Sequence, residues 1–252
     1  MKALVINLAS ETTRMAFMAD QLTALGIGFV RLEATTPKTL SPPASSPYWT
    51  LWERPMRITE MAAMASHRAA WGRVVDADAP MLILEDDAVL HADTPAFLQK
   101  IAALPEADHV TLETRGRAKL IARGAHAAAP MHRLWQDRSG AAAYVLRPSG
   151  ARKLLANVAQ APGLADGIIC AAYDVMSWQA VPALAVQLDQ CAAYGLTPPI
   201  QTESTIDQEA RPNAPKSPAQ THRRIRAQVC MGIRQLIRRP GAQRLFVPYG
   251  TR

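Results

Sequence analysis

The chain has 252 residues, 49% of them hydrophobic and 19% charged, which is enough for one α/β domain with or without a tail. No apolar run approaches the length of a membrane span, and Asn7 interrupts the first apolar run too early for a signal peptide, so we expect the chain in the cytoplasm. Its three cysteines, Cys170, Cys191 and Cys230, lack metal-binding spacing and are interpreted as buried or surface thiols.

The net charge of +7 is unevenly distributed along the chain. Ten of the 28 Lys and Arg residues lie in 210–252, which contains no acid, and 18 remain in 1–209 against 21 acidic residues. The body is therefore slightly acidic and the tail is the basic element. We divide the chain into a domain at 1–210 and a Pro-rich linker with a basic amphipathic helix at 211–252.

The N-terminal part has a β-α-β pattern, with a strand at 3–8, a helix at 11–25 and a strand at 28–33. Such an opening predicts a parallel pair with a right-handed crossover. The prolines of 36–56 predict a loop, and Thr59 begins a helix that runs to about residue 75.

Strands and helices continue to alternate after this helix. Strands are predicted at 81–85, 109–113, 141–146 and 181–186, and helices at 94–104, 148–158, 166–173 and 221–238. The segment 115–133 shows no clear pattern, and the proline-rich 195–220 predicts irregular structure. The alternation favours an α/β fold with a mostly parallel sheet and helices on both faces.

The most informative motif is Met81-Leu-Ile-Leu84, an apolar run that leads straight into Glu85-Asp86-Asp87. Ligands of α/β sheets bind at the carboxyl ends of such buried strands. Three adjacent carboxylates repel one another unless a cation lies among them, which indicates Mn²⁺ or Mg²⁺. Since strand side chains alternate, Glu85 and Asp87 should share one side and Asp86 the other. The alternative is a solvated acidic turn.

The segment before this strand has Glu60, Ser66-His67 and Trp71 on one predicted helix. Together with the strand ending in Leu84-Glu85-Asp86-Asp87, it resembles glycosyltransferase family 25 of bacterial lipopolysaccharide and lipooligosaccharide biosynthesis. Further matches follow in order at Ile6-Asn7-Leu8 with Arg14, 140–144, 149–155, Asp166 and 203–206.

The resemblance covers roughly residues 2–210 and is weak in 35–56 and 115–135. It also departs from the family pattern at two places. Ala62-Ala63 stand where the family often has Gly-Cys, and Thr35-Thr36-Pro37 where Asp-Gly often follows the second strand.

The resemblance implies a GT-A-like, Rossmann-like domain. The implied reaction is a metal-dependent, inverting transfer of a hexose, galactose first, from a UDP-sugar to a surface glycolipid or polysaccharide acceptor. Asp87 is then the expected ligand of Mn²⁺ or Mg²⁺, with Glu85 touching metal-bound water or the ribose. The expected nucleotide-sugar site is formed by Asn7, Arg14, Glu60, Ser66, His67, Glu85 and Asp86.

An inverting transfer needs one carboxylate to accept the proton of the attacking hydroxyl. That carboxylate must lie across the pocket from the metal, which disfavours 85–87. We predict Asp166, which follows a Gly-containing loop at a position where the family has an acid. Glu113 and Asp174 are the other candidates.

Each of these residues also has a purely structural interpretation. Ser66 and His67 lack a neighbouring Asp that would suggest a nucleophilic triad, and they could simply occupy a helix face. Asp166 could be a helix N-cap, and Glu60 could favour a helix N-terminus. Trp71 and Tyr144 are expected in the core, and Arg14 could be a surface arginine.

The basic tail carries Ile225, Val229, Ile233 and Leu236 at helical spacing, surrounded by arginines. This pattern predicts an amphipathic helix on the anionic inner face of the cell membrane. The alternative is a stripe that packs on the body of the protein. Nucleic acid is not expected as a partner, since aromatic residues are absent between the charges.

Two other function classes are alternatives to a transferase. An Asp-dependent phosphohydrolase would need Asp as the first acid of the strand end, where this chain has Glu85. A non-catalytic nucleotide-sugar or glycan-binding module of the same fold would not need the intact acid cluster.

Overall fold

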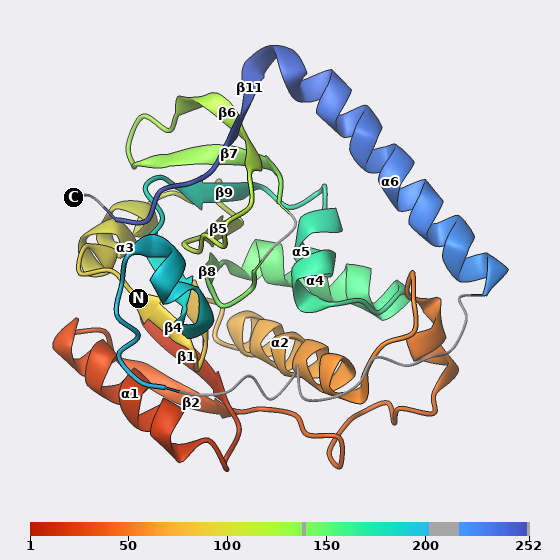
Figure 1. The fold of residues 1–252 in the computed structure, drawn as a ribbon, viewed down its shortest axis with the longest axis horizontal. Helices are drawn as coiled ribbons and strands as arrows, with labels where there is room; N and C mark the ends of the chain where they lie inside the picture. The colour runs from red at the N-terminus through yellow and green to blue at the C-terminus, as the bar shows by residue number, and fades with distance from the viewer. Residues whose placement is uncertain (138–139, 202–216, 251–252) are drawn as a thin grey trace.

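A nine-stranded sheet of order β11-β6-β7-β9-β5-β8-β3-β1-β2 forms the centre of the protein (Figure 1). This computed structural model describes residues 1–137, 140–201 and 217–250. The strands are β1 (Lys2–Asn7), β2 (Phe29–Glu33), β3 (Met81–Glu85), β5 (His109–Thr111), β6 (Lys119–Ala125), β7 (Met131–Gln136), β8 (Ala143–Leu146), β9 (Ser177–Ala180) and β11 (Ala242–Leu245). A separate antiparallel pair consists of β4 (Ala88–Leu90) and β10 (Ala185–Gln187).

Helices cover both faces of the sheet, so the predicted α/β class is confirmed. One face carries α1 (Thr12–Ala24) and α3 (Thr94–Ala102), and the other carries α2 (Ile58–Asp76), α4 (Pro148–Gln160) and α5 (Ala165–Ala171). Strand β1 shows why both faces must be covered, since Ala3 and Val5 pack on the first face and Leu4 and Ile6 on the second. Strands buried on both faces are apolar at every position.

The sheet is mixed, which differs from the expected mostly parallel sheet. Strands β2, β1 and β3 are parallel neighbours, as are β5 and β9, whereas the other five pairs are antiparallel. Strands β6 and β7 occupy the segment that shows no clear sequence pattern. Only residues 126–130 connect them, too few for the crossover that a parallel pair needs.

The predicted strand at 181–186 is confirmed only in part, because only its last two residues lie in a strand, β10. The chain instead leaves the main sheet after β9 and enters the small sheet at β10, with 181–184 between them. Pro182 lies at this break, and it cannot donate a backbone hydrogen bond to a strand neighbour. The 36–56 loop contains the short 3₁₀ helix η1 (Pro47–Leu51), and η2 (Leu188–Tyr194) follows β10.

Helix α6 (Pro218–Arg238) confirms the predicted C-terminal helix, which begins at a Ser217–Gln220 capping box. After the turn η3 (Arg239–Gly241), the chain returns to the sheet as β11, which pairs with β6. The 203–206 motif, Arg211, Lys216 and the boundary between 210 and 211 lie outside the described residues. Within the described ranges no single helix has the length and apolar composition of a membrane span, and the combined pair α4 and α5 is bent by 109°.

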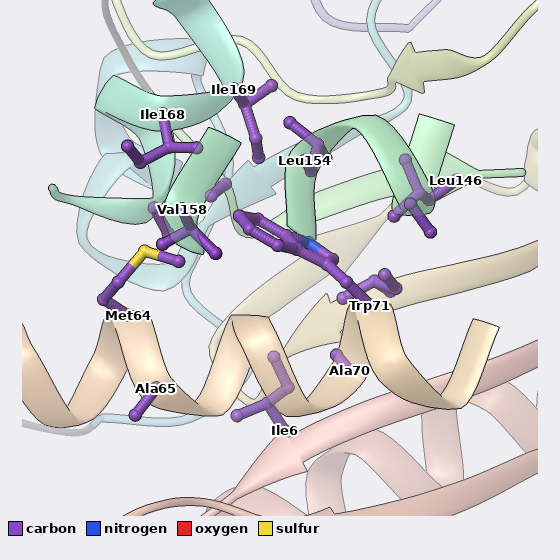
Figure 2. Close-up of a cluster of buried hydrophobic side chains, with 14 of the residues drawn as sticks. Ile6, Met64, Ala65, Ala70, Trp71, Leu146, Leu154, Val158, Ile168 and Ile169 are labelled. Atoms are coloured by element: carbon purple, nitrogen blue, oxygen red, sulfur yellow. The ribbon is translucent and has the colours of Figure 1, made fainter. Parts of the chain in front are cut away.

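Trp71 lies at the centre of the core between α2 and α4. Its side chain is fully buried and reaches from α2 toward Leu154 and Val158 (Figure 2). The indole N–H donates a hydrogen bond of 2.8 Å to the hydroxyl of Tyr144, which is also buried. The expected core positions of both residues are confirmed, and this contact joins the core to the polar site described below.

We predict that Trp71→Ala lowers the free energy of unfolding by about 3–5 kcal/mol, because it leaves a large cavity in the core. Urea denaturation followed by circular dichroism measures this change. The control Trp71→Phe keeps most of the volume and removes the N–H donor, so it should cost less. A loss below about 1 kcal/mol for the alanine variant would contradict the central packing role.

Candidate active site

Backbone contacts hold the acidic turn at the end of β3. Its three acidic side chains point in different directions and have different surroundings. Glu85 is the last residue of β3, and the turn continues into β4, which pairs with β10. The Leu188 N–H donates 2.9 Å to the Asp87 carbonyl. The small β4–β10 sheet therefore fixes the turn against the start of η2.

Asp86 joins β3 to the first strand and helix. Its carboxylate accepts a 2.7 Å hydrogen bond from the Asn7 side-chain amide and a 3.3 Å contact from the Arg14 guanidinium. The Asn7 side-chain oxygen accepts 2.8 Å from Arg31 Nε. Burial raises the pKa of Asp86, and Asn7 and Arg14 offset this only in part. Asn7, Arg14 and Asp86 thus form one buried polar bridge at the β1–α1 crossover.

Glu85 ends a directional chain of hydrogen bonds that starts in the core. Because the Tyr144 hydroxyl accepts the indole N–H of Trp71, its own proton is left for Nδ1 of His67 at 2.9 Å. The Nε2–H of His67 then donates to Glu85 Oε1 at 3.0 Å. This tautomer is assigned from the network, since tryptophan can only donate.

The second oxygen of Glu85 accepts 3.3 Å from the Gln187 side chain. Burial acts to raise the pKa of Glu85, but the hydrogen bond from His67 reverses this and the pKa is lowered. Glu85 is therefore held as a carboxylate. His67 and Tyr144 orient it from behind.

Of the three acids in this turn, only Asp87 has a buried side-chain oxygen, Oδ1, without a hydrogen-bond partner among the described residues. Burial raises its pKa well above the ordinary value, and the charges of Glu85, Asp86 and Glu113 raise it further. An acid in this position needs either a proton or a cation.

Glu113 lies behind the site rather than on its wall. It is 1% exposed, and its Oε2 accepts 2.9 Å from the Ala142 N–H. Gly140, at φ +87°, passes so close that a Cβ there would lie 2.2 Å from the same carboxylate. Burial and the Glu85 charge raise the pKa of Glu113 to about 8. At neutral pH it is mostly protonated, which makes it a poor general base.

Glu60 and Ser66, both on α2, form hydrogen bonds with other parts of the protein. Glu60 accepts two 2.9 Å bonds from the Arg54 guanidinium and one from the Arg57 N–H, which completes a capping box. Burial would raise the pKa of Glu60, but these partners lower it. The Ser66 hydroxyl donates to the Ala62 carbonyl and accepts from the Thr35 N–H, both at 2.8 Å. Both residues still line the cavities described below.

Asp166 lies in the first turn of α5. The N-cap of this helix is Leu164, so the N-cap interpretation of Asp166 is wrong. Its Oδ1 accepts 2.7 Å from the Gly167 N–H, and burial raises its pKa. The Trp52 ring packs on the backbone beside it, since a Cβ at Gly163 would meet that ring at 2.6 Å.

Three connected cavities link these residues. A cavity of about 190 Å³ beside the β1–α1 turn is lined by Asn7, Arg14, Ser66 and the 85–87 turn. It shares Arg14, His67, Glu85 and Asp87 with a second cavity of about 260 Å³, which extends to Asp166. A third cavity of about 500 Å³ shares Leu164 and Asp166 with the second and ends at α6. Asp87 and Asp166 thus both line the second cavity.

The protein side chains alone do not complete the ligands of a divalent cation, so water and substrate phosphate would have to supply the rest. No three His, Cys, Asp or Glu side chains of the described residues converge into a metal site. However, Asp87 Oδ1 is buried without a hydrogen-bond partner in this part of the chain, and Glu85 lines the same cavity. Magnesium-type sites commonly use one or two carboxylates and complete their ligands with water and phosphate. Asp87 and Glu85 match that pattern.

Sequence reasoning did not find several residues of the cleft. Gln187 is the last residue of β10 and lies just beyond the strand predicted at 181–186. Arg115, which pairs with Asp189 at 3.0 Å, begins the segment without a clear pattern. Trp52 and Arg54 lie in the proline-rich loop. None of these residues has a motif of its own, although the Arg54–Glu60 pair could have been suggested by charge.

Comparison with known proteins identifies the family. A family model described as "Glycosyltransferase family 25 (LPS biosynthesis protein)" matches residues 1–175, more than half of the chain. The chain belongs to glycosyltransferase family 25. The predicted family and enzyme class are therefore confirmed. A search of curated protein sequences finds no match.

Two solved structures resemble the glycosyltransferase in overall arrangement. One is a Drosophila β-1,4-galactosyltransferase 7 mutant in complex with manganese, UDP-Gal and xylobiose, with 7% identity and a TM-score of 0.40 over 85% of this chain and 81% of that one. The other is an inositol-1-phosphate CTP transferase from T. maritima, with 12% identity and a TM-score of 0.38 over 93% and 76%. At these scores neither likeness carries a functional argument.

The raised pKa of Glu113 predicts a dependence of stability on pH. Between its ordinary pKa of 4.5 and about 8, the folded chain keeps a proton that the unfolded chain has lost. Stability should therefore fall as pH rises through this window, by on the order of a few kcal/mol. Glu113→Gln cannot ionise, so it should flatten the dependence.

Chemical denaturation of both proteins across this pH range, with a chelator present, measures the slope. The control Asp20→Asn changes an exposed side chain on α1, outside the site, so it should leave the slope unchanged. Equal slopes for wild type and Glu113→Gln would show that Glu113 does not hold the extra proton.

Proposed function

We propose that this glycosyltransferase moves a hexose, galactose as the first choice, from a UDP-sugar to a glycolipid or oligosaccharide acceptor, with inversion and with Mn²⁺ or Mg²⁺. The observation that carries the proposal is the single cleft that joins Asp87, whose Oδ1 has no hydrogen-bond partner among the described residues, to Asp166. Family membership supplies the reaction class.

The donor nucleotide fits the cavity beside the β1–α1 turn. Nucleotides bind at such crossovers at the carboxyl ends of parallel strands. Arg14 lines both this cavity and the next, so its guanidinium is available to a diphosphate while Asp86 holds it in place. Ser66 supports the same wall by fixing the backbone of Thr35.

Asp87 and Glu85 would hold the divalent cation. Bound there, it would offset the negative charge of the departing diphosphate. Glu85 suits this place because His67 and Gln187 fix both of its oxygens and keep it ionised. The carboxylate of Asp87 would bind more directly, since its Oδ1 has no hydrogen-bond partner among the described residues.

The acceptor would enter from the side of α6. The cavity between α5 and α6 is lined by the aromatic rings of Trp52 and Tyr173 and by polar groups such as Gln228, and it reaches Asp166. Asp166 would take the proton of the attacking hydroxyl. Asp174, the other candidate, is exposed in the segment between α5 and β9, where its side chain accepts a hydrogen bond from Asn157 of α4.

The products released distinguish a transferase from a binding module and from a phosphohydrolase. A transferase releases free nucleoside diphosphate only when donor and acceptor are both present or by slow donor hydrolysis. A binding module releases none, and a phosphohydrolase releases phosphate from a generic phosphoester. Assays of these products over a panel of nucleotide sugars, with and without Mn²⁺, separate the three.

We expect Asp87→Asn to abolish Mn²⁺-dependent binding of UDP-galactose, because the variant loses the charge that faces the cation. Isothermal titration calorimetry with and without Mn²⁺ measures the effect. Without metal the variant should be no less stable than wild type, since it replaces a buried acid whose charged form is disfavoured by burial and by the neighbouring Glu85 and Asp86. Asp20→Asn, on the exposed side of α1, is the control. Unchanged metal dependence would exclude Asp87 as a ligand.

Asp166→Asn should lower turnover by about 10²–10⁴-fold while donor affinity stays nearly constant, because the variant cannot accept a proton. In wild type, activity should fall as pH drops through the pKa of Asp166, which burial raises above the ordinary range. Steady-state kinetics across pH measure both effects. Asp174→Asn is the matched control and should keep its activity; lost donor binding in Asp166→Asn would make Asp166 a binding residue instead.

A further inference from the structure

Helix α6 turns its polar side toward the protein. The guanidinium of Arg234 lies over the Tyr173 ring at 4.2 Å, and that of Arg238 over the Trp135 ring at 4.1 Å. The Gln235 amide donates to the side chain of Gln136. These contacts, with the return of the chain into β11, fix how the helix is rotated.

The opposite side of α6 is apolar and exposed. Its large residues are each between 52% and 69% exposed, and they are Ile225, Val229, Ile233, Leu236 and Ile237. Their spacing of three and four residues places them on one face of the helix. Phe246, just after β11, is also 69% exposed. The alternative that this stripe packs on the body is therefore wrong.

This orientation is the reverse of that expected for a surface helix, whose apolar side normally faces the core. Figure 1 shows α6 along the outer margin of the molecule, so its outer side is not covered by another described element. A contiguous apolar stripe rimmed by polar groups marks an interaction surface.

We propose that the outer face of α6 binds an anionic lipid surface. Arg226, three residues before Val229 and seven before Ile233, lies on the apolar face itself, and its long side chain can reach lipid headgroups. Arg239, just after the end of α6, is also exposed. A basic amphipathic helix of this kind lies flat in the boundary between headgroups and acyl chains.

A second copy of the chain is a poorer occupant of this face. A symmetric dimer would place the same patch on both sides of the interface and bring the arginines together. No acid occurs in 210–252 to offset them. Anionic headgroups supply the opposite charge, and acyl chains supply the apolar environment.

If the proposed function holds, lipid binding by the outer face of α6 would place the acceptor cavity next to the bilayer. The inner side of α6 lines the acceptor cavity through Arg224, Ala227, Gln228 and Met231. A glycolipid could then remain in the bilayer while its sugar passes α6 toward Asp166. The lipid contact itself does not depend on catalysis.

Co-sedimentation of the full chain with vesicles tests the proposal. Wild type should bind vesicles of phosphatidylcholine with phosphatidylglycerol, lose binding at high salt, and bind phosphatidylcholine alone weakly. The double variant Ile233→Asn with Leu236→Asn should weaken binding by about tenfold or more, because two apolar side chains that would be buried against the acyl chains are lost. Arg226→Gln should weaken it by about fivefold on anionic vesicles only.

Val30→Thr, at an apolar residue 39% exposed on β2, is the matched control and should bind like wild type. A polarity-sensitive label on the exposed thiol of Cys230 should report a less polar environment with anionic vesicles. Donor binding of the double variant, measured in solution, should be unchanged, which separates this proposal from the proposed function.

Equal binding of wild type and the double variant, or of neutral and anionic vesicles, would overturn the proposal. So would a dimer, measured by sedimentation velocity, that the same double variant dissociates while wild type fails to bind vesicles. In that case a second copy covers the face.

Discussion

Electrostatic repulsion among four carboxylates at the end of β3 is the constraint on which the site depends. These carboxylates lie close together, so that the charge of one raises the pKa of another. They are Glu85, Asp86, Asp87 and Glu113. The fold assigns each a different partner: His67 for Glu85, Asn7 and Arg14 for Asp86, and a proton for Glu113. Asp87 is left with the least compensation. A site that holds one undercompensated buried acid is prepared for a cation.

The remaining acids can be held in place because the packing behind them is rigid. Trp71 is fully buried between α2 and α4, and its N–H fixes the hydroxyl of Tyr144, which fixes the ring of His67. The apolar core and the charged site therefore share one continuous set of contacts. Such second-layer support determines how accurately a site residue is oriented.

Local sequence patterns predicted the N-terminal half of the fold well. The apolar run at 81–84 predicted β3 to the residue, and the helix predicted from Thr59 to about residue 75 agrees with α2 to within two residues. Strand direction was not readable, because an apolar strand buried on both faces looks the same in either orientation. The β6–β7 hairpin was missed because its strands mix charged and small residues with apolar ones.

The site was predictable only where several functional groups adjoin in sequence. The three consecutive acids of 85–87 predicted a site there. Gln187 and Trp52 reach the cleft through long-range packing, which no local pattern encodes. Helix α6 is a second example of this limit. Its amphipathic spacing was plain in the sequence, but which side faces the protein depends on where Trp135 and Tyr173 lie in the fold. Arginines that stack on these rings direct the apolar side outward, so the orientation of the helix follows from the body it rests on rather than from its own periodicity.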